Sequence, residues 1–280
     1  MLSRRMLLDS DGITVEDFAC RHTGGRGDAV ELSTRHALVF VRSGCFIRSV
    51  DGVESLLDPT LAYCMKPGEE QRFDHPHANG DDCTTIALDR ALVASLWGDD
   101  ETLPAAPLPI PPRLDVAHRL LLAAAHRGAD PDQLTERAIT VAAQALGQAG
   151  PRHVFASRPA TAQARRDLVD GARAVLAAEP GCPLPQLARR LAVSPHHLSR
   201  IFHAATGHTI SRHRMRLRAR AALERLAGGE RDLARLAADI GFADQGHLCR
   251  VMRAEAGRVP SALREALSPQ LTPANSPEVV

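Results

Sequence analysis

The last hundred residues carry a pattern of apolar positions that occurs twice. In each copy, leucine, isoleucine and alanine recur at spacings of three and four residues, which places them on one face of a short helix. The first copy begins at Leu184 and the second at Leu233, an offset of 49, whereas Leu198 and Leu248 align at an offset of 50. The turn of the second copy therefore holds one additional residue. Two short helices around a tight turn, present twice, predict two helix-turn-helix motifs.

Capping residues mark where the second helix of each copy begins and ends. Ser194 followed by Pro195 supplies an N-cap and a favourable first helical residue. In the second copy Asp244 is the better cap, because Ala243 has no side chain that accepts a hydrogen bond. Glycines are expected to relieve the second turn and to end both second helices: Gly241, Gly207 and Gly257.

A single long helix is predicted between the two copies, from Ile210 to Ala227. Alanine, leucine and arginine dominate this segment, and all three form helices well. A helix of about 18 residues is roughly 27 Å long, which could hold two recognition helices about one DNA turn, or about 34 Å, apart. Five arginines alternate along it, and we expect some of them to contact phosphate and most to be solvated: Arg212, Arg214, Arg216, Arg218 and Arg220.

The N-terminal part carries short runs of β-forming residues separated by turn residues. The runs are 37–41, 45–50, 61–65 and 83–88, and Asp51-Gly52 is the clearest hairpin turn. Closely spaced strands of this kind predict an antiparallel barrel or double sheet. Helical spacing returns over 112–149, where two apolar stripes predict a helical hairpin. This hairpin either dimerises or packs on its own barrel.

Charge divides the chain into an acidic part and a basic part. Between Gln163 and Glu265 there are 18 arginines against 10 acidic residues, a net charge of +8, whereas residues 1–162 carry a net charge of −6. The near-neutral whole chain therefore hides a basic segment that coincides with the two motifs. Such segregation favours binding to the phosphate backbone of DNA over the alternative of helical hairpins that merely pack into a bundle.

Composition limits the compartment and the role of the cysteines. The 280 residues include six cysteines without a CxxC pair, and there is no leader peptide or membrane-spanning apolar run. We therefore expect a cytoplasmic protein with free thiols and no membrane partner. Cys45, Cys64 and Cys83 lie in predicted strands and are expected to be buried and inert, although a redox sensor built from Cys64 and Cys83 is an alternative.

The C-terminal segment resembles the DNA-binding domain of the AraC/XylS transcriptional regulators over about Leu168 to Arg264. The second copy carries the specific part of the resemblance: Leu236-Ala237-x-x-Ile240-Gly241-Phe242-x-Asp244-Gln245-x-His247-Leu248-x-Arg250-x-Met252, followed by Gly257-Arg-Val-Pro260-x-x-Leu263-Arg264. Ala243 and Gly246 depart from this pattern, where serines are common. The second recognition helix is therefore expected to read bases less well than the first.

The segment from Pro67 to His77, followed by Gly80-Asp81-Asp82-Cys83-Thr84, resembles the half-barrel of a cupin, the sensor domain of many such regulators. Its His75-Pro-His77, followed by Asp82 or Cys83, could supply three ligands to zinc or iron. The downstream glutamate and second histidine of a cupin metal site are not evident, so we expect solvent-facing histidines in a loop, with no metal and no cofactor. The chain is predicted not to be an enzyme. The main alternative function is that of a metal-dependent cupin enzyme.

The predicted fold class is α+β and multidomain. An N-terminal antiparallel cupin-like β-barrel with a helical hairpin precedes a C-terminal all-α domain with two helix-turn-helix motifs joined by a long helix. The predicted boundaries are 1–111 for the sensor, 112–149 for the hairpin, 150–163 for a linker, 164–267 for the DNA-binding domain and 268–280 for a disordered tail.

The outward faces of the two recognition helices supply the candidate DNA contacts. Arg200 and Arg250 are the strongest candidates, because arginine can bind guanine through two hydrogen bonds, while Gln245 could pair with adenine. The alternative for either arginine is a phosphate contact or an ion pair. The complete predicted set is His196, Ser199, Arg200, His203, Gln245, Gly246, Cys249 and Arg250.

Together these features predict a sequence-specific DNA-binding transcriptional regulator that acts as an activator. Its expected partners are double-stranded promoter or operator DNA, a small-molecule effector or partner sensed by the N-terminal domain, RNA polymerase and a second copy of the chain. A constitutive regulator whose N-terminal domain only dimerises is the remaining alternative.

Overall fold

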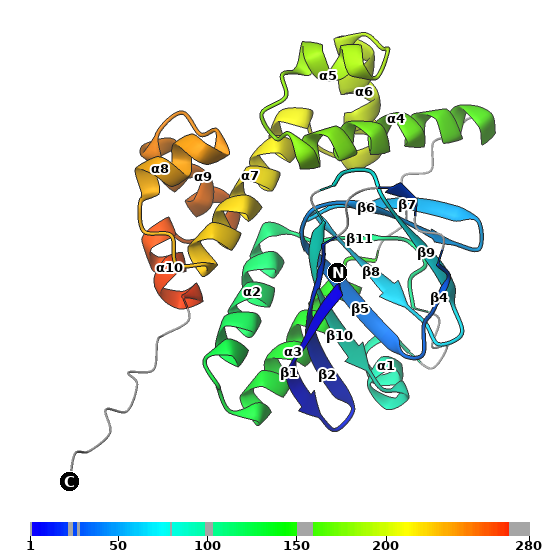
Figure 1. The fold of residues 1–280 in the computed structure, drawn as a ribbon, viewed down its shortest axis with the longest axis vertical. Coiled ribbons are helices and arrows are strands. Elements are labelled where there is room, and N and C mark those ends of the chain that lie inside the picture. The colour runs from blue at the N-terminus through cyan, green and yellow to red at the C-terminus, as the bar shows by residue number, and fades with distance from the viewer. Residues whose placement is uncertain are drawn as a thin grey trace.

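The computed structural model describes residues 2–21, 25–26, 29–78, 80–98, 103–149 and 159–268. The described strands lie in the first part of the chain and seven of the described helices in the last part (Figure 1). We call residues up to 149 the N-terminal domain and those from 159 the C-terminal domain.

Two antiparallel sheets form the N-terminal domain. The first has the order β1 (Leu2–Ser10), β2 (Ile13–Cys20), β10 (Asp81–Leu88), β5 (His36–Ser43), β8 (Leu61–Met65) and β11 (Leu108–Pro109). The second has the order β3 (Gly25–Arg26), β9 (Glu70–His75), β6 (Phe46–Val50) and β7 (Val53–Leu57), with β4 (Glu31–Leu32) also paired to β9. The double sheet expected from the sequence is confirmed.

Strand β5 is buried on both faces, which explains its uninterrupted apolar run. Leu38 and Phe40 pack into a core beneath the helices, whereas Val39 and Val41 face the second sheet. Successive side chains of a strand point to opposite faces, so a strand covered on both sides needs apolar residues throughout. This run therefore predicted a strand more clearly than any other predicted run in the sequence.

The four predicted strands are confirmed, and several further strands were missed. Strand β1 is mostly exposed and charged, and β7 and β9 each carry polar residues on an exposed face, so none of them shows a clear apolar run. The predicted hairpin turn at Asp51-Gly52 joins β6 to β7, and both residues have a positive φ, 49° and 75°. Positive φ at both central positions fits the mirror-image turn that suits the twist of a hairpin.

Three helices complete the N-terminal domain: α1 (Arg90–Trp97), α2 (Pro112–His126) and α3 (Pro131–Leu146). Apolar residues of α2 and α3, such as Leu121 and Val141, share one core with Leu38 and Ile86 of the first sheet. The hairpin therefore packs on its own sheet, one of the two arrangements left open by the sequence. Asp130 caps α3 by accepting hydrogen bonds from the backbone N–H groups of its first turn.

The C-terminal domain consists of helices. They are α4 (Pro159–Ala178), α5 (Leu184–Arg190), α6 (Pro195–Thr206), α7 (Ile210–Ala227), α8 (Leu233–Ile240), α9 (Gln245–Ala256) and α10 (Pro260–Leu267). Helix α7 runs between the two pairs α5–α6 and α8–α9 (Figure 1). One apolar core joins α4 to α5 and α6, and a second joins α8, α9 and α10, with α7 contributing to both.

The linker predicted over 150–163 needs a correction at its C-terminal end. Helix α4 begins at Pro159, because proline suits the first turn of a helix and the alanine-rich sequence after it continues the helix. The rest of that predicted linker, 150–158, lies outside the described residues. Most of the predicted tail, 269–280, lies outside them as well.

Candidate nucleic-acid interface

The first motif is formed by α5 and α6, and local hydrogen bonds set its recognition helix. The Ser194 side chain accepts a hydrogen bond from the backbone N–H of His197 at 3.2 Å, with Pro195 as first helical residue. Gly207 ends α6 with a φ of 72°, in the left-handed region that favours glycine. The cap predictions for this helix are confirmed.

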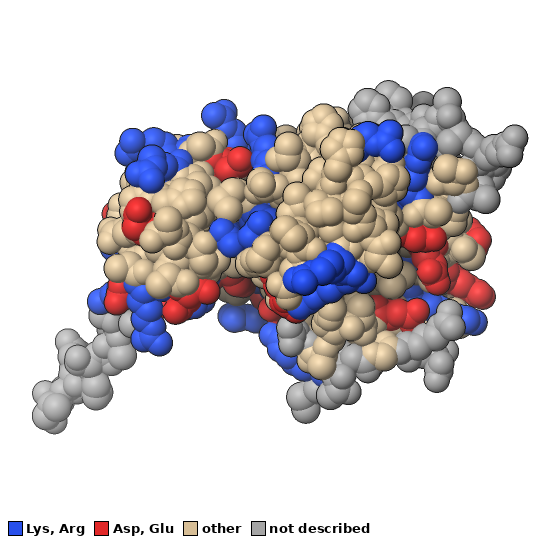
Figure 2. All heavy atoms as spheres, turned by 90° about the horizontal axis from the view of Figure 1, so that it is seen from above, with Lys and Arg blue, Asp and Glu red and all other residues tan. Residues whose placement is uncertain are grey.

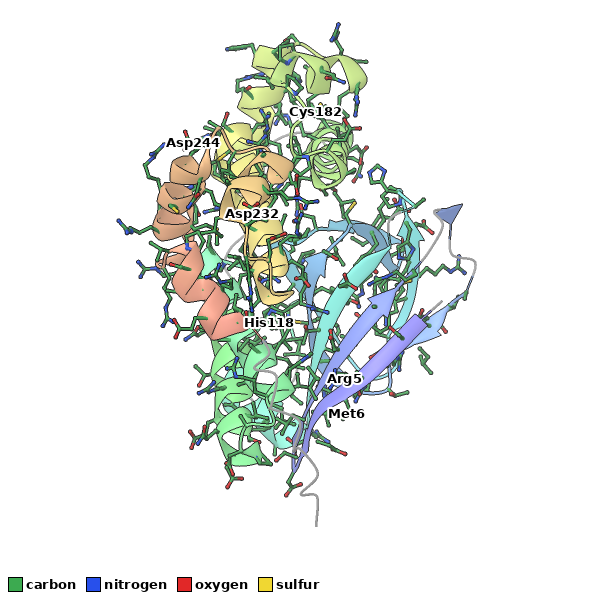
Figure 3. The ribbon with its side chains drawn as sticks, turned by 60° about the vertical axis from the view of Figure 1, so that its left-hand side comes forward. Arg5, Met6, His118, Cys182, Asp232 and Asp244 are labelled. Carbon is green, nitrogen blue, oxygen red and sulfur yellow. The ribbon has the colours of Figure 1, made fainter. Side chains whose placement is uncertain are left out.

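The second motif, α8 and α9, is built in the same way. Asp232 caps α8 and Asp244 caps α9, where its carboxylate accepts from the backbone N–H of His247 at 2.6 Å (Figure 3). Gly241 and Gly257 end the two helices with φ values of 85° and 74°. Ala192, the equivalent of Gly241 in the first motif, also has a positive φ, 55°, so both turns pass through a left-handed residue and the additional residue of the second turn follows it.

Both recognition helices bury one face and leave the other exposed. Leu198, Ile201 and Phe202 of α6 and Leu248 and Met252 of α9 are buried. Ser199 and Cys249 are half-buried, and the other predicted contact residues are exposed: His196, Arg200, His203, Gln245, Gly246 and Arg250. The sequence therefore assigned the outward faces correctly, while contact between these residues and DNA stays a prediction.

Arg250 lies over the first turn of its own helix. A Cβ atom added to Gly246 would stand 3.3 Å from Nη1 of Arg250, so the absence of a side chain at Gly246 leaves room for this guanidinium. The surface beside it forms a shallow hollow of about 300 Å³, lined by Cys249, Arg250, Arg253 and Ala254.

Positive side chains lie across the helical face seen from above, in groups separated by uncharged residues (Figure 2). The positive charge is therefore distributed rather than gathered into one continuous patch. Arg200 and Arg250 form no ion pair with the described residues, which leaves both guanidinium groups available to a ligand.

The arginines of α7 correct a prediction, because most of them are engaged with protein groups rather than solvated. Arg214 donates hydrogen bonds to the carbonyls of Pro180 and Gly181, both at 3.0 Å, and Arg218 donates to Pro180 at 3.3 Å. These bonds fix the turn that leads into α5. Unpaired helix carbonyls and turn carbonyls are good acceptors for guanidinium groups.

Two further arginines of α7 reach the second motif. Arg212 and Arg216 lie 3.8 Å and 3.7 Å from the carboxylate oxygens of Glu255 on α9. Helix α7 therefore fastens the first motif through Arg214 and the second through Glu255. Four of the five alternating arginines therefore contact protein groups beside the two motifs.

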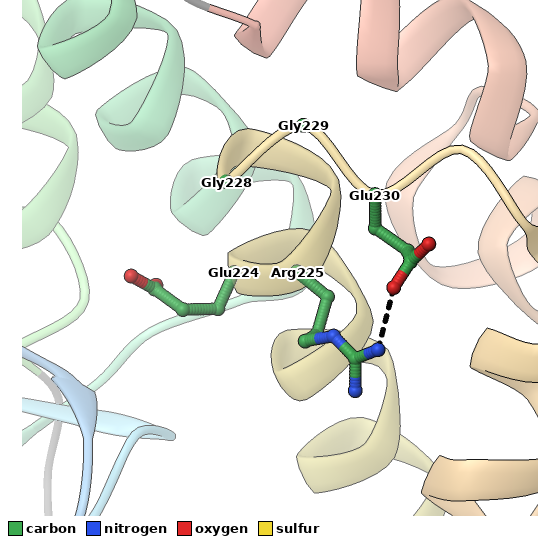
Figure 4. Close-up of a pocket in the computed structure, with 5 residues that line it drawn as sticks. All are labelled: Glu224, Arg225, Gly228, Gly229 and Glu230. Carbon is green, nitrogen blue, oxygen red and sulfur yellow. Dashed lines mark hydrogen bonds and ion pairs between the residues drawn. The ribbon is translucent and has the colours of Figure 1, made fainter.

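The end of α7 turns into the second motif at two glycines. Gly229 has a φ of 88°, and Arg225 forms an ion pair with Glu230 across the turn, with 2.5 Å between Nη2 and Oε2 (Figure 4). A hollow of about 320 Å³ is lined by Arg225, Glu230, both glycines and Glu224. Glu224 itself points away from Arg225, toward the N-terminal domain (Figure 4).

The first contact between the domains is a buried ion cluster around Asp58, which directly follows β7. The Asp58 side chain is fully buried, and its Oδ2 lies 2.8 Å from Nη2 of Arg173 on α4 and 3.7 Å from Nε2 of His213 on α7. Thr60 donates to the other carboxylate oxygen at 2.6 Å. We call these four residues the Asp58 cluster.

Opposing effects act on the pKa of Asp58. Burial by itself raises the pKa, but Arg173, His213 and the hydrogen bonds from Thr60 outweigh burial and hold the pKa at about 2. Burial lowers the pKa of His213 to about 4, against the attraction of Asp58. At neutral pH the cluster therefore contains one carboxylate, one guanidinium and a neutral imidazole.

His213 connects this cluster to the first recognition helix. Its ring stands edge-on to Phe202 of α6, with 5.3 Å between the ring centres, and its Nδ1 lies 3.3 Å from Nε2 of His208. Phe202 is fully buried in the core of the first motif. The N-terminal domain is therefore connected to α6 in two steps, from Asp58 to His213 and from His213 to Phe202.

The second contact between the domains joins α2 to α7. Arg119 pairs with Glu224 and with Asp115, which in turn lies 3.7 Å from Nε of Arg220. Arg220 is 2% exposed and donates to the carbonyl of Ile110 at 2.6 Å. Apolar residues of α2 extend this contact, since Val116 and Ala123 share the core of the second motif.

The interdomain residues were missed by the sequence analysis. No role was predicted for Asp58, and Arg220 was expected only as one of five alternating arginines. Each pair joins segments about a hundred residues apart, such as Asp58 and Arg173. Nothing local in the sequence marks such a pairing.

The predicted histidine cluster is only partly brought together. His75 is buried at the end of β9 rather than exposed in a loop, which corrects that expectation. The Nε2 atom of His77 instead lies 3.2 Å from the carbonyl of Ala174 on α4. Asp82 pairs with Arg21 at 2.6 Å, and Cys83 is buried between the sheets. These four residues do not form the ligand set that the sequence suggested.

A protein-family model matches part of the C-terminal domain. Residues 187–266 match a protein family described as a helix-turn-helix domain. No curated protein sequence matches the chain. No described helix is long and apolar enough to cross a membrane.

Solved structures with similar arrangements include ToxT from Vibrio cholerae, at a TM-score of 0.40 and 9% identity, covering 93% of this chain and 99% of that one. An RmlC-like cupin from Shewanella frigidimarina is similar at a TM-score of 0.27 and 22% identity, covering 32% and 78%. A cupin superfamily protein from Desulfitobacterium hafniense gives 0.27 and 15%, covering 31% and 77%.

Proposed function

We propose, from the premise that residues 187–266 are a helix-turn-helix domain of the AraC type, that this DNA-binding regulator recognises specific promoter or operator sequences through α6 and α9. The observation that carries the proposal is the pair of capped helices, each with an exposed arginine, held by one helix. Such an arrangement suits two successive major grooves on one face of the duplex.

Arg200 and Arg250 are proposed to read bases. Both are exposed and neither is engaged by a described acidic group, so binding to DNA would not have to break an existing ion pair. Ser199, His203 and Gln245 lie on the same outward faces and would contact bases or phosphates beside them. Sequence preference is proposed to come mainly from α6, because Gly246 contributes no side chain to α9.

The N-terminal domain is proposed to respond to an effector and to pass the response to α6. Support comes from the Asp58 cluster, whose Arg173 and His213 belong to the DNA-binding domain. A buried ion pair separates at a large cost if either charge remains without a partner. The cluster is therefore suited to two discrete arrangements rather than to gradual movement.

Further roles are proposed for the chain as a whole. The chain acts as a regulator rather than an enzyme, an activator that contacts RNA polymerase, and it binds DNA as a homodimer or as a monomer with two motifs. A repressor with the same interface would bind the same DNA but would lower transcription from a reporter promoter.

The decisive test starts with sequencing the genomic fragments that the purified chain retains. Affinity for a retained fragment and for scrambled DNA is then measured at one salt concentration for wild type, Arg200→Ala and the control Arg235→Ala. Arg235 is 73% exposed on α8, outside both recognition helices. We expect Arg200→Ala to weaken the specific fragment far more than scrambled DNA, and Arg235→Ala to change both alike. Equal losses for Arg200→Ala would contradict base reading.

A further inference from the structure

Three different metal-binding side chains meet at one end of the two sheets. Cys20 ends β2, His75 ends β9 and Asp81 begins β10. Cys20 and Asp81 stand directly opposite each other in the antiparallel pair of β2 and β10, while His75 comes from the second sheet. One donor atom from each lies within 4.8 Å of the others, and Nε2 of His75 is 3.6 Å from Oδ1 of Asp81.

The backbone that carries these residues is packed as closely as glycine permits. A Cβ atom added to Gly80 would stand 2.2 Å from the carbonyl oxygen of Cys20, and one added to Gly44 would stand 2.2 Å from the carbonyl oxygen of Gly80. Both glycines also have positive φ, 67° and 77°. The ends of β2, β5 and β10 are thereby locked together, which fixes where Cys20 and Asp81 lie.

One carboxylate oxygen of the cluster is buried without a hydrogen-bond partner among the described residues. Asp81 is 3% exposed, and its Oδ2 has no hydrogen-bond partner among the described residues. Arg21 lies nearby, but its guanidinium donates to the backbone carbonyl of Asp81 and pairs with Asp82. A buried carboxylate oxygen without a donor costs free energy unless it binds a cation or a donor.

We propose that Cys20, His75 and Asp81 bind a divalent metal ion of the zinc class. Thiolate, imidazole and carboxylate are ligands that Zn²⁺ accepts together, and three protein ligands leave a fourth tetrahedral position for water or a small anion. Binding replaces the proton of the Cys20 thiol by the metal and releases that proton to solvent. This ligand set shares only His75 with the set suggested by the sequence.

The proposed site lies close to the contact between the domains. Two residues beyond His75, His77 contacts the carbonyl of Ala174 on α4. Metal binding that draws β9 and β10 together would therefore act next to the residues that hold α4.

The test uses the full chain, freed of metal with a chelator and titrated with Co²⁺ as a spectroscopic substitute for Zn²⁺. We expect one equivalent to produce a thiolate-to-Co²⁺ charge-transfer band and tetrahedral ligand-field bands, both displaced by Zn²⁺. Cys20→Ser should abolish the charge-transfer band, and His75→Gln and Asp81→Asn should each weaken affinity by about 100-fold or more. Cys249→Ser removes a thiol from α9 as a control and should titrate like the wild type.

Circular dichroism of each metal-free variant checks that it remains folded, and half-buried Cys20 is the site residue least apt to disturb the core. A second readout is a Zn²⁺-dependent rise in the melting temperature of the wild type, absent in Cys20→Ser. No saturable binding by the wild type, or a charge-transfer band that persists in Cys20→Ser, would overturn the site. Because both readouts follow the metal, they succeed or fail independently of DNA binding.

Discussion

The two helix-turn-helix motifs share one pattern, yet residues of the N-terminal domain enter the apolar core of the second and not the described core of the first. The first motif is held through buried charge, since Asp58 meets Arg173 and His213 beneath α6. The second is held both by ion pairs, such as Arg119 with Glu224, and by apolar residues of α2 that enter its core, such as Val116. Buried charge resists partial separation, whereas apolar contact weakens in proportion to the area exposed. The first motif, whose described core holds no residue of the N-terminal domain, thus depends more on buried charge for its attachment than the second.

The largest expected effect comes from removing the charge of the Asp58 cluster. Asp58→Asn keeps the size of the side chain but leaves Arg173 buried without a carboxylate, which should lower the free energy of unfolding by about 3–5 kcal/mol. Urea denaturation followed by circular dichroism measures it. Asp9→Asn on exposed β1 is the control and should change stability little. A small loss in Asp58→Asn would show that the first motif is not held by charge.

Acid should destabilise the fold through buried histidines, one in the Asp58 cluster, His213, and one on α2, His118. The pKa of His213 is about 4 when folded and that of His118, stacked on Phe40, is about 3, against about 6.5 in an unfolded chain (Figure 3). Because the unfolded chain then binds more protons, stability is complete above about pH 6.5 and falls as the pH drops toward 4. Loss of Asp58 ionisation adds to this as the pH falls from about 3.9 toward 2.

Urea midpoints measured from pH 8 to pH 4 check this prediction. His213→Gln should flatten the profile, because one of the groups that gain a proton on unfolding is gone. His203→Gln, exposed on α6, is the matched control and should keep the wild-type slope. A profile of unchanged slope in His213→Gln would mean that this imidazole does not contribute.

A smaller effect should distinguish the two recognition helices. Arg200→Ala is expected to reduce affinity for the specific fragment by about 1–3 kcal/mol, and Arg250→Ala by less than Arg200→Ala. Titrations of the two variants on one labelled fragment give this order directly. The reverse order would assign the main sequence preference to α9 despite Gly246.

The smallest effect is expected where α2 enters the second motif. Val116→Ala removes about two methylene equivalents from a buried site, which should cost about 1.5 kcal/mol of stability. Thermal unfolding of the variant beside Val53→Ala, which is 64% exposed, measures the difference. An effect as large as that of Asp58→Asn would remove the distinction between the two attachments.

The sequence predicted the C-terminal elements more closely than the N-terminal ones, for a physical reason. Ser194, Asp244 and Gly207 act on backbone groups within a few residues, so their effect can be read locally. Strand β9 depends on β6, three strands earlier in the chain, and β1 pairs with the adjacent β2, but neither β1 nor β9 shows a clear apolar run. Local signals therefore predicted the helices well, whereas strands such as β1 and β9 were missed.

The predicted contact set and the missed residues differ in the same way. The outward faces of α6 and α9 follow from helical periodicity, which placed Arg200 and Arg250 correctly on the surface. The burial of Arg218 and Arg220 could not be predicted, because their partners come from Pro180 and from Ile110 and Asp115. A run of arginine is read as surface charge until the acceptors opposite it are known.

The continuity of α7 limits the spacing of the DNA sites that this protein could bind. An unbroken helix of 18 residues does not lengthen, and Glu255 and the Pro180 turn clamp a motif to each side of it. The gap between the two DNA-reading surfaces is consequently a constant of the molecule. A base pair inserted between the two half-sites of a target would have to be compensated by a change in the twist of the duplex. Natural targets should therefore share one half-site spacing even when their base sequences differ.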